Sequence, residues 1–356
     1  MKMAFRWFGP GFDPIPLEHI RQIPGVKGVI TTLYDKAPGE PWERDGIRAL
    51  KKASENCGLA VLGIESVNIH DSIKAALPER DRHIEAYIRT LEALGEEGID
   101  LVCYNFMPVF DWTRSNLAKV RSDGSTVMSY DQSVIDSIDP ANMFSQMKAK
   151  SNGFALPGWE PERLAKIKEL FDLYRGIDKD RLFDNLVYFL KAIMPTCDRY
   201  GIDMAIHPDD PAWPVFGLPR VVTSGEDLLK LFDAVDDPHN GVTLCSGSLG
   251  SNPSNDIPKI IRSLKGRIPF AHVRNLAHHS PGKFDEAAHL SSDGSFDLYE
   301  IMKALYDIGF DGVLRPDHGR AIWGEKSMPG YGLYDRALGV AYLNGLWEAI
   351  EKAERG

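Results

Sequence analysis

Four residues with metal-binding side chains recur at wide intervals in the second half of the chain. They are His207 in AIHP, Cys245 in TLCSG, His272 in FAHVRN and Asp317 in RPDHG. Imidazole, thiolate and carboxylate groups together form the donor set of a transition-metal site. Any one of these side chains alone is more often hydrogen-bonded or packed in a core. Because each interval is about one strand plus one helix, we predict that the four residues bind one divalent metal ion.

The choice of metal follows from the number of ligands. Two histidines, one cysteine and one aspartate suit zinc, but they also suit iron(II) and manganese(II). Four protein ligands in a tetrahedron would close a zinc site, whereas a catalytic ion needs open positions for substrate. An ion that accepts five or six ligands leaves that room, so the sequence favours Mn²⁺ or Fe²⁺ at a catalytic site.

Arginines lie close to the same positions in the sequence. Arg274 is two residues after His272, and Arg315 is two residues before Asp317, so in a strand each would share a face with its neighbour. Arginine binds planar carboxylates in a bidentate manner. These side chains therefore pair with acids inside the protein, or they bind a small, negatively charged, oxygen-rich substrate. The residues that we expect to contact substrate are Arg6, Trp7, Asn68, Asn105, Arg274 and Arg320.

Groups that transfer protons are also expected near the predicted metal site. His318 adjoins Asp317, and Tyr331 and Tyr334 follow in PGYGLYDR. A histidine titrates near neutral pH and is a common general acid or base, although a loop histidine is as often only hydrogen-bonded. Glu286 and His289 are further titratable residues in FDEAAHL.

The elements that would position these residues alternate along the chain. Short apolar runs without strict polar alternation predict strands that are buried on both faces. The eight predicted strands are Phe5–Gly9, Val26–Thr32, Leu59–Ser66, Leu101–Phe106, Asp203–Pro208, Gly241–Gly247, Ile268–Asn275 and Gly312–His318. The predicted helices are Leu17–Gln22, Glu43–Asn56, Asp81–Glu97, Asp180–Tyr200, Ser224–Val235, Asp256–Leu264, Phe296–Ile308 and Leu333–Lys352.

This alternation predicts an α/β fold with a parallel sheet. In a chain of 356 residues the favoured form is a single (β/α)8 TIM barrel over residues 1–356, with strand ends converging on one rim. An open doubly wound sheet is the alternative, but no GxGxxG follows the first strand. The segment 107–179 interrupts the alternation after strand four. It carries Trp112, Tyr130 and Trp159 and weak helical patterns, and we interpret it as a lid or an oligomer contact.

Composition limits the partners and the compartment. The net charge of −10 argues against nucleic acids and anionic membranes, which select basic surfaces. Four scattered cysteines without a CxxC pair indicate a reducing, cytoplasmic setting, and we expect neither a signal segment nor a membrane span. The expected partner is a small, negatively charged, oxygen-rich molecule, and we expect a homo-oligomer.

Several strings in the sequence resemble the mannonate dehydratase family, and the resemblance runs from Phe5 to the final helix. They are FRWFGP, GIESV, CYNFMPVFDWTR, HPDDP, LCSGSLG, HVRN, RPDHGR and PGYGLYDRALG. The resemblance implies a xylose-isomerase-like barrel that uses Mn²⁺ or Fe²⁺ to remove water from D-mannonate, giving 2-keto-3-deoxy-D-gluconate in hexuronate (glucuronate) catabolism. It also implies His207, Cys245, His272 and Asp317 as metal ligands.

The same resemblance implies that His318 and one tyrosine of PGYGLY transfer protons, and it leaves Tyr331 and Tyr334 open. The stretch between HVRN and FDE departs from the family pattern, so His278 and His279 are expected to be incidental. Two other functions remain as alternatives. One is a metal-dependent sugar isomerase or epimerase on the same barrel, and the other is a sugar-acid-binding protein without catalytic activity.

Overall fold

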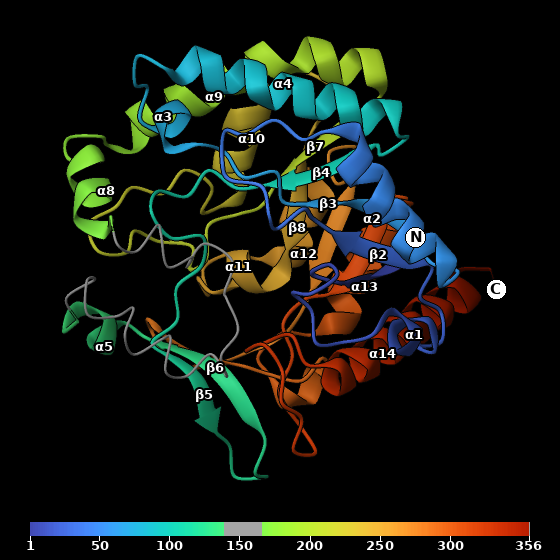
Figure 1. Ribbon diagram of the computed structural model, residues 1–356. Coiled ribbons are helices and arrows are strands. Elements are labelled where there is room, and N and C mark those ends of the chain that lie inside the picture. Colours follow the sequence, from blue (N-terminus) through green and yellow to red (C-terminus); the bar gives the residue numbers. More distant parts are fainter. Residues whose placement is uncertain (139–165, 356) are drawn as a thin grey trace.

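Eight parallel strands close into a barrel in the computed structural model, which describes residues 1–138 and 166–355 (Figure 1). Around the barrel the order is β1-β12-β9-β8-β7-β4-β3-β2, and β1 pairs with both β12 and β2 to close it. Each predicted strand overlaps one of them, so the predicted barrel is confirmed. The strands are β1 (Lys2–Arg6), β2 (Gly28–Thr31), β3 (Ala60–Glu65), β4 (Leu101–Tyr104), β7 (Asp203–Ile206), β8 (Asn240–Cys245), β9 (Phe270–Val273) and β12 (Val313–Pro316).

Side chains inside the barrel determine which residues reach its rim. A small buried cluster, separate from the main apolar core, consists of Ala4, Ile30, Leu101, Cys103, Ala205, Phe270 and Val313. Side chains on one face of a strand recur every second residue. Two residues beyond Ala205 and Phe270 are His207 and His272, and four beyond Val313 is Asp317. The apolar floor of the barrel therefore continues directly into the candidate metal ligands.

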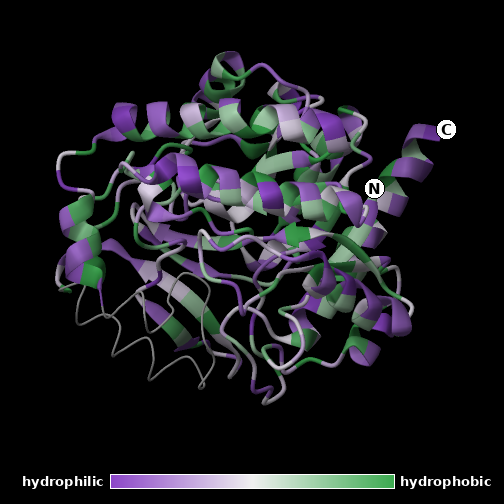
Figure 2. Cartoon of the chain, turned by 45° about the horizontal axis from the view of Figure 1, so that its top comes forward, coloured by the Kyte–Doolittle hydropathy of each residue, from purple (hydrophilic) through white to green (hydrophobic). Residues whose placement is uncertain are grey.

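Helices surround the barrel, and all eight predicted helices are present. Figure 2 shows hydrophobic and hydrophilic residues alternating along them, as expected for helices with one face on a sheet. The Ser224 side chain accepts a hydrogen bond from the backbone N–H of Asp227 at 3.2 Å, so the predicted cap of α10 is confirmed. The helices are α1 (Leu17–Arg21), α2 (Arg44–Asn56), α4 (Arg80–Glu96), α9 (Lys179–Tyr200), α10 (Gly225–Ala234), α12 (Ile257–Ser263), α13 (Leu298–Asp307) and α14 (Leu333–Arg355).

Short elements that the sequence analysis did not predict follow several strands. The helices α3 (Asp71–Lys74) and α11 (Ser246–Gly250) come after β3 and β8, and a 3-10 turn spans Ser291–Asp293. The predicted strand Gly241–Gly247 is too long, because the chain enters α11 directly after Cys245. No helix among residues 1–138 and 166–355 is long and apolar enough to cross a membrane.

A second sheet, which the sequence analysis did not predict, follows strand four. It has the order β10-β11-β6-β5, and its pairs are antiparallel. Figure 1 shows β5 and β6 extending away from the barrel. The sheet joins the insertion to the loop after β9. Its strands are β5 (Asn116–Val120), β6 (Thr126–Asp131), β10 (Leu276–Ser280) and β11 (Lys283–Glu286).

The insertion also contains helical structure in its described parts. These are the helices α5 (Gln132–Asp136) and α8 (Ile167–Leu173). The part of the predicted insertion from 139 to 165, which includes Trp159, lies outside the described residues. The hairpin β5–β6 had a sequence signal in Asp123-Gly124, because such pairs are typical of tight turns and Gly124 has a positive φ of 82°.

Candidate metal centre and substrate pocket

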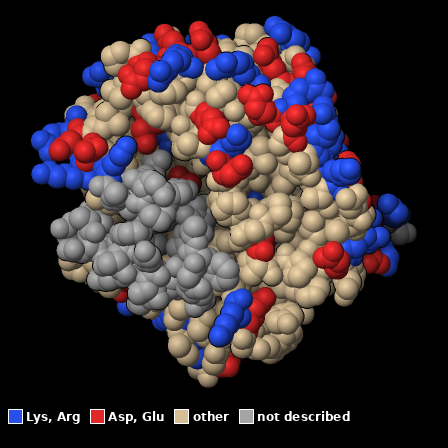
Figure 3. Space-filling view, in the orientation of Figure 1, with Lys and Arg blue, Asp and Glu red and all other residues tan. Residues whose placement is uncertain are grey.

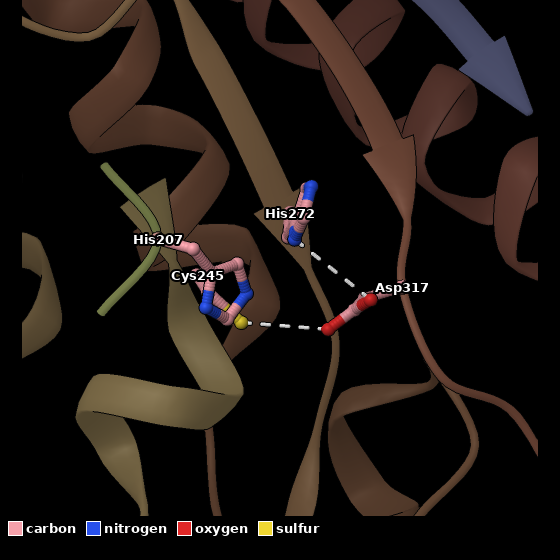
Figure 4. Close-up of side chains that lie close together, drawn as sticks. All are labelled: His207, Cys245, His272 and Asp317. Atoms are coloured by element: carbon pink, nitrogen blue, oxygen red, sulfur yellow. Dashed lines mark hydrogen bonds and ion pairs between the residues drawn. The ribbon is translucent and has the colours of Figure 1, made fainter. Parts of the chain in front are cut away.

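The four predicted metal ligands lie together at the carboxyl ends of four neighbouring barrel strands. One ligand atom from each of His207, Cys245, His272 and Asp317 lies within 4.8 Å of the others. Figure 4 shows the four side chains directed toward one another, with Cys245 Sγ and one nitrogen of His272 facing the two oxygens of Asp317. The structure therefore brings together the residues that the sequence spacing had singled out.

Local hydrogen bonds orient these side chains. Nδ1 of His207 lies 2.8 Å from the carbonyl oxygen of Pro208, so it donates there and leaves Nε2 available to a ligand. Cys245 Sγ lies 3.4 Å from Asp317 Oδ2, and it accepts the backbone N–H of Ser248 at the start of α11, also at 3.4 Å. The site is thus held by the backbone as well as by side chains.

The charge state of the site favours a cation. Burial raises the pKa of Cys245, but the Arg274 charge and a hydrogen bond with His207 outweigh it and lower the pKa to about 5. The pKa of Asp317 is held well below its usual range, against burial, by His318, Arg315 and Arg274. Thiolate and carboxylate are the forms that coordinate metals. Two imidazoles, a thiolate and a carboxylate at these distances fit a divalent transition metal.

A buried network of ions lies beside the ligand group. Arg274 pairs with Asp317 (Nε to Oδ2, 2.9 Å), with Asp210 (Nη2 to Oδ2, 2.6 Å) and with Glu286. Arg114, from the insertion, pairs with the same Asp210 at 2.7 Å and the same Glu286 at 2.6 Å. Both arginines and both of the carboxylates that they share, Asp210 and Glu286, are nearly inaccessible to solvent. Buried charges are tolerated only when they are paired and hydrogen-bonded, so this network holds the base of the site rigidly.

The neighbouring pocket has a volume of about 650 Å³. His207 and Asp317 line it, as do His318 and Tyr331, and Arg6, Asn68 and Asn105 from the first half of the barrel line it too. On the face shown in Figure 3, acidic and basic side chains are interspersed. The described ends of the insertion also contribute to the pocket, through Met107, Asp111, Trp112, Lys166, Leu170 and Leu173.

Three residues expected to contact substrate lie elsewhere. Arg274 is fully buried, its guanidinium is occupied by three carboxylates, and it does not line the pocket. Arg320 pairs with Asp335 at 2.8 Å and with Asp123 of the hairpin at 3.1 Å, and it also lies outside the pocket lining. Trp7 is buried away from the pocket. None of the three lines the pocket, so their contact with substrate stays a prediction.

Arg6 differs from the other arginines of the barrel rim. Its Nη1 donates to the backbone carbonyls of Trp7 at 3.1 Å and Ile30 at 3.2 Å, and its guanidinium lies over the ring of Phe8. Among the described residues it forms no ion pair with a carboxylate. A buried guanidinium that lines a pocket without an acidic partner is suited to an anionic ligand.

The structure also distinguishes between the two tyrosines. Tyr331 is only 7% exposed, lines the pocket and has its hydroxyl 3.1 Å from Nε2 of His318. Tyr334 is 43% exposed, and its ring packs against that of Trp323 outside the pocket. The other ring nitrogen of His318, Nδ1, lies 3.1 Å from Glu286 Oε1. Only Tyr331 is therefore in position to act with His318.

The remaining histidines named from the sequence are outside the pocket. His289 is buried against Gly339 of α14. His278 contacts the carbonyl oxygen of Gly250 at 2.9 Å, and His279 contacts Asp285 at 2.8 Å.

Sequence reasoning missed three residues of the site. Glu65 ends β3 in GIESV and lines the pocket, Asp210 follows His207 in HPDDP, and Arg114 lies in DWTR of the insertion. For Glu65 a signal was present, because it is an acidic residue at a strand end like Asp317. For Asp210 and Arg114 no periodicity would reveal that they pair with each other.

A closed parallel barrel with a metal-ligand group at its carboxyl rim places the chain in the structural class of xylose-isomerase-like barrels. A xylose isomerase domain protein from Planctomyces limnophilus superposes with a TM-score of 0.58 at 12% identity, covering 98% of both chains. The model of the family D-mannonate dehydratase (UxuA) matches residues 1–356, and the chain belongs to this family.

Individual relatives agree with this assignment. The chain is 69% identical over 352 residues to a mannonate dehydratase of Brachyspira hyodysenteriae, covering 99% of both proteins. It is 54% identical to that of Geobacillus thermodenitrificans, over 100% of this chain and 96% of the relative. The crystal structure of mannonate dehydratase from Streptococcus suis serotype2 superposes with a TM-score of 0.90 at 43% identity, covering 99% and 96% of the two chains.

Solved epimerases share less with this chain. A D-psicose 3-epimerase structure superposes with a TM-score of 0.57 at only 13% identity, a likeness that extends to the fold alone. The isomerase or epimerase alternative is therefore not favoured.

Proposed function

We propose that this protein is a hydro-lyase that converts D-mannonate to 2-keto-3-deoxy-D-gluconate and water in hexuronate catabolism. The observation that carries the proposal is the group of His207, Cys245, His272 and Asp317, of which His207 and Asp317 line the same pocket as the His318–Tyr331 pair. Membership in the mannonate dehydratase family supports it. The ion we propose for the ligand group is Mn²⁺ or Fe²⁺, because both accept more ligands than the four that the chain offers.

The reaction sets two chemical requirements. A proton must leave C2, next to the substrate carboxylate, where it is very weakly acidic. Hydroxide must leave C3, and it is a poor leaving group unless it is protonated. When bound, the divalent ion supplies positive charge that stabilises the negative charge developing next to the carboxylate. The remaining work is a proton transfer at each carbon, which requires one base and one acid.

His318 and Tyr331 are the acid–base pair of the proposal. Glu286 is ionised, because the Arg274 and Arg114 charges outweigh burial and lower its pKa to about 2. Nδ1 of His318 lies 3.1 Å from this carboxylate and 2.9 Å from Nη1 of Arg274, and Nε2 lies on the side of Tyr331 and the pocket. The proposal requires the tautomer in which Glu286 accepts the Nδ1–H and Nε2 carries the lone pair. His318 then takes the C2 proton. Burial raises the pKa of Tyr331, so its hydroxyl keeps the proton that the departing C3 hydroxide needs.

Arg6 is the residue that we propose to bind the substrate carboxylate. It lines the pocket, and its described partners are backbone carbonyls rather than acids. Asn68 and Asn105 lie on the same wall and offer amide donors and acceptors that suit the hydroxyl groups of a sugar acid. In this proposal Arg6 binds the charged end of the substrate, and the two asparagines bind its polyhydroxyl chain.

The insertion 107–179 is part of the proposal as a cover of the pocket. Its described ends line the pocket through Trp112, Leu170 and Leu173, and Arg114 pairs with Asp210 beside the ligands. The alternative role as an oligomer contact, and the expected homo-oligomer, are tested by light scattering of the intact insertion and of a shortened variant. The cytoplasmic location rests on the four free cysteines and is tested by cell fractionation.

The decisive experiment incubates the purified protein and Mn²⁺ with D-mannonate and measures 2-keto-3-deoxy acid. D-Mannose is the control, because it lacks the carboxylate. Formation of the keto acid from D-mannonate, but not from D-mannose, supports the proposal. Interconversion of neutral sugars without loss of water would instead support an isomerase, and binding of mannonate without product would support a binding protein.

A further inference from the structure

The two ring nitrogens of His272 have different surroundings. Nδ1 faces the ligand group, 3.8 Å from Asp317 Oδ1, and Nε2 lies 3.4 Å from Glu65 Oε2. The ring is fully buried, and Nε2 makes no hydrogen bond with the described residues. Figure 4 shows one nitrogen of His272 directed toward Asp317 and the other directed away from the remaining ligands. A buried N–H at this position needs an acceptor, and the Glu65 carboxylate is beside it.

Glu65 reaches His272 from the opposite side of the barrel. It ends β3, which lies four strands away from β9 in the closed ring of eight. Arg315 fixes the carboxylate from two directions, with Nη2 donating to Oε1 at 2.8 Å and Nε donating to Oε2 at 3.2 Å. Nη1 of the same arginine lies 3.0 Å from Asp317 Oδ1. A continuous chain of charged groups therefore connects two of the metal ligands.

The other histidine of the group shows why His272 needs this partner. His207 donates Nδ1–H to the backbone carbonyl of Pro208, and that bond selects Nε2 as its ligand atom. His272 has the opposite arrangement, with Nδ1 facing the group. Histidines that bind metals almost always donate the second ring N–H to a carbonyl or carboxylate, which fixes the tautomer and the ring orientation.

We infer that Glu65 is a positioning residue of the metal centre: its Oε2 accepts the Nε2–H of His272, so that His272 offers Nδ1 to the ion, while Arg315 holds Glu65 in place. The inference rests on the proposed metal site. Two other roles for Glu65 must be separated from this one. It also neutralises Arg315, and it is 14% exposed at the pocket wall, where it could contact substrate.

The test measures Mn²⁺ affinity directly, from the electron paramagnetic resonance signal of the free ion during titration. When a metal-binding histidine loses the acceptor of its second ring N–H, metal affinity falls roughly 10–100-fold, and we expect a loss of this size for Glu65→Ala. Glu65→Gln keeps an oxygen that accepts the N–H, so we expect a smaller loss. Asp35→Asn is the matched control, because Asp35 is an exposed carboxylate of the same pocket without a described contact to the ligands. It should leave the affinity unchanged.

A second readout reports on coordination rather than on stability. With Co²⁺ in place of Mn²⁺, the visible absorption spectrum should shift in Glu65→Gln and should not shift in Asp35→Asn. Circular dichroism checks folding, and the near-isosteric Glu65→Gln decides the matter if Glu65→Ala does not fold.

The outcomes separate the hypotheses. Unchanged Mn²⁺ affinity and an unchanged Co²⁺ spectrum in both Glu65 variants would overturn the inference. Normal metal affinity with a lost kcat would also overturn it, because Glu65 would then act on substrate. A wild-type protein that binds no Mn²⁺ would instead refute the proposed metal site itself.

Discussion

The two sides of the pocket differ in how their charges are paired. On the side of β7, β8, β9 and β12, Arg274 contacts three carboxylates and is fully buried. On the side of β1 to β4, Arg6 contacts backbone carbonyls and faces the pocket. Paired charges keep the ligand group and His318 in place, whereas the Arg6 guanidinium forms no ion pair among the described residues and is available to an anion. In the proposed function, the first side holds the catalytic groups and the second binds the substrate.

Removal of the metal should have the largest effect, because it disables the first of these sides completely. We expect exhaustive chelation to abolish keto-acid formation, and we expect Mn²⁺ to restore it better than Mg²⁺, since thiolate and imidazole prefer the softer ion. Cys245→Ser should weaken Mn²⁺ binding while thermal unfolding stays close to that of the wild type. Full activity after chelation, with metal content verified by mass spectrometry, would rule the metal mechanism out.

The next largest effect is expected at the proton-transfer pair. His318→Asn and Tyr331→Phe should each lower kcat by about 10²–10⁴-fold, the usual contribution of a general acid or base. Mannonate binding and metal content should remain. Tyr334→Phe is the matched control, because Tyr334 is exposed outside the pocket, and its kcat should not change.

Isotope exchange separates the two roles. Tyr331→Phe keeps the base and should still exchange the C2 proton of mannonate with deuterated solvent, whereas His318→Asn should not. Near-normal turnover of His318→Asn at full metal occupancy would exclude the histidine as the base.

The sequence predicted much of the pocket side that carries the metal-ligand group and less of the side that carries Arg6. Strand ends of a parallel barrel converge, so the four ligands and His318 followed from strand spacing alone. Which arginine faces the pocket did not follow, because Arg6 ends β1, Arg274 directly follows β9, and the sequence does not reveal the acidic neighbours of either. Those of Arg274 include Asp210, in the loop after β7, and Glu286, at the end of β11, and both are positioned by long-range contacts.

The second sheet shows the same limit for the fold. Hairpin turns at Asp123-Gly124 and Pro281-Gly282 are local signals and could have predicted β5–β6 and β10–β11 individually. Their pairing joins Lys283 to Asp131 across more than a hundred residues, and no local pattern encodes that register. The contact between Arg114 of the insertion and Asp210 is also long-range, so no local pattern predicts it.

Arg274 should matter for stability as well as for activity. Arg274→Ala leaves Asp210, Glu286 and Asp317 with fewer partners in a buried site, and breaking a buried ion pair typically costs about 3–5 kcal/mol. Denaturant unfolding should show this loss. Arg262→Ala is a suitable control, because its ion pair with Asp307 is partly exposed and such pairs contribute little. Unchanged stability of Arg274→Ala would mean that Arg114 alone neutralises the network.

Arg6 should show the opposite behaviour. Arg6→Ala should weaken kcat/KM for mannonate by about 2–4 kcal/mol, the loss expected when a charged group loses its partner in a buried contact. Its unfolding free energy should fall less than that of Arg274→Ala, because Arg6 has no buried carboxylate to leave unpaired. Arg6→Lys retains the charge without the bidentate geometry, so its kcat/KM should lie between those of the wild type and Arg6→Ala. Equal kcat/KM for wild type and Arg6→Ala would move the carboxylate site to another residue.

The smallest effect concerns the insertion, where the two sides of the pocket meet. Trp112, Leu170 and Leu173 line the pocket from the described parts of segment 107–179, so bound substrate should contact and stabilise them. We expect limited proteolysis to cleave first within this segment, and we expect D-mannonate with Mn²⁺ to slow the cleavage. Mannitol, which has the same polyhydroxyl chain without the carboxylate, is the control and should not protect. The hairpin β5–β6 should resist cleavage in both cases, because Arg121 pairs with Asp293 at 2.7 Å and Arg320 holds Asp123. Identical digestion with and without mannonate would leave the insertion a role in structure or in subunit contact, and substrate closure would then have to involve other loops of the rim.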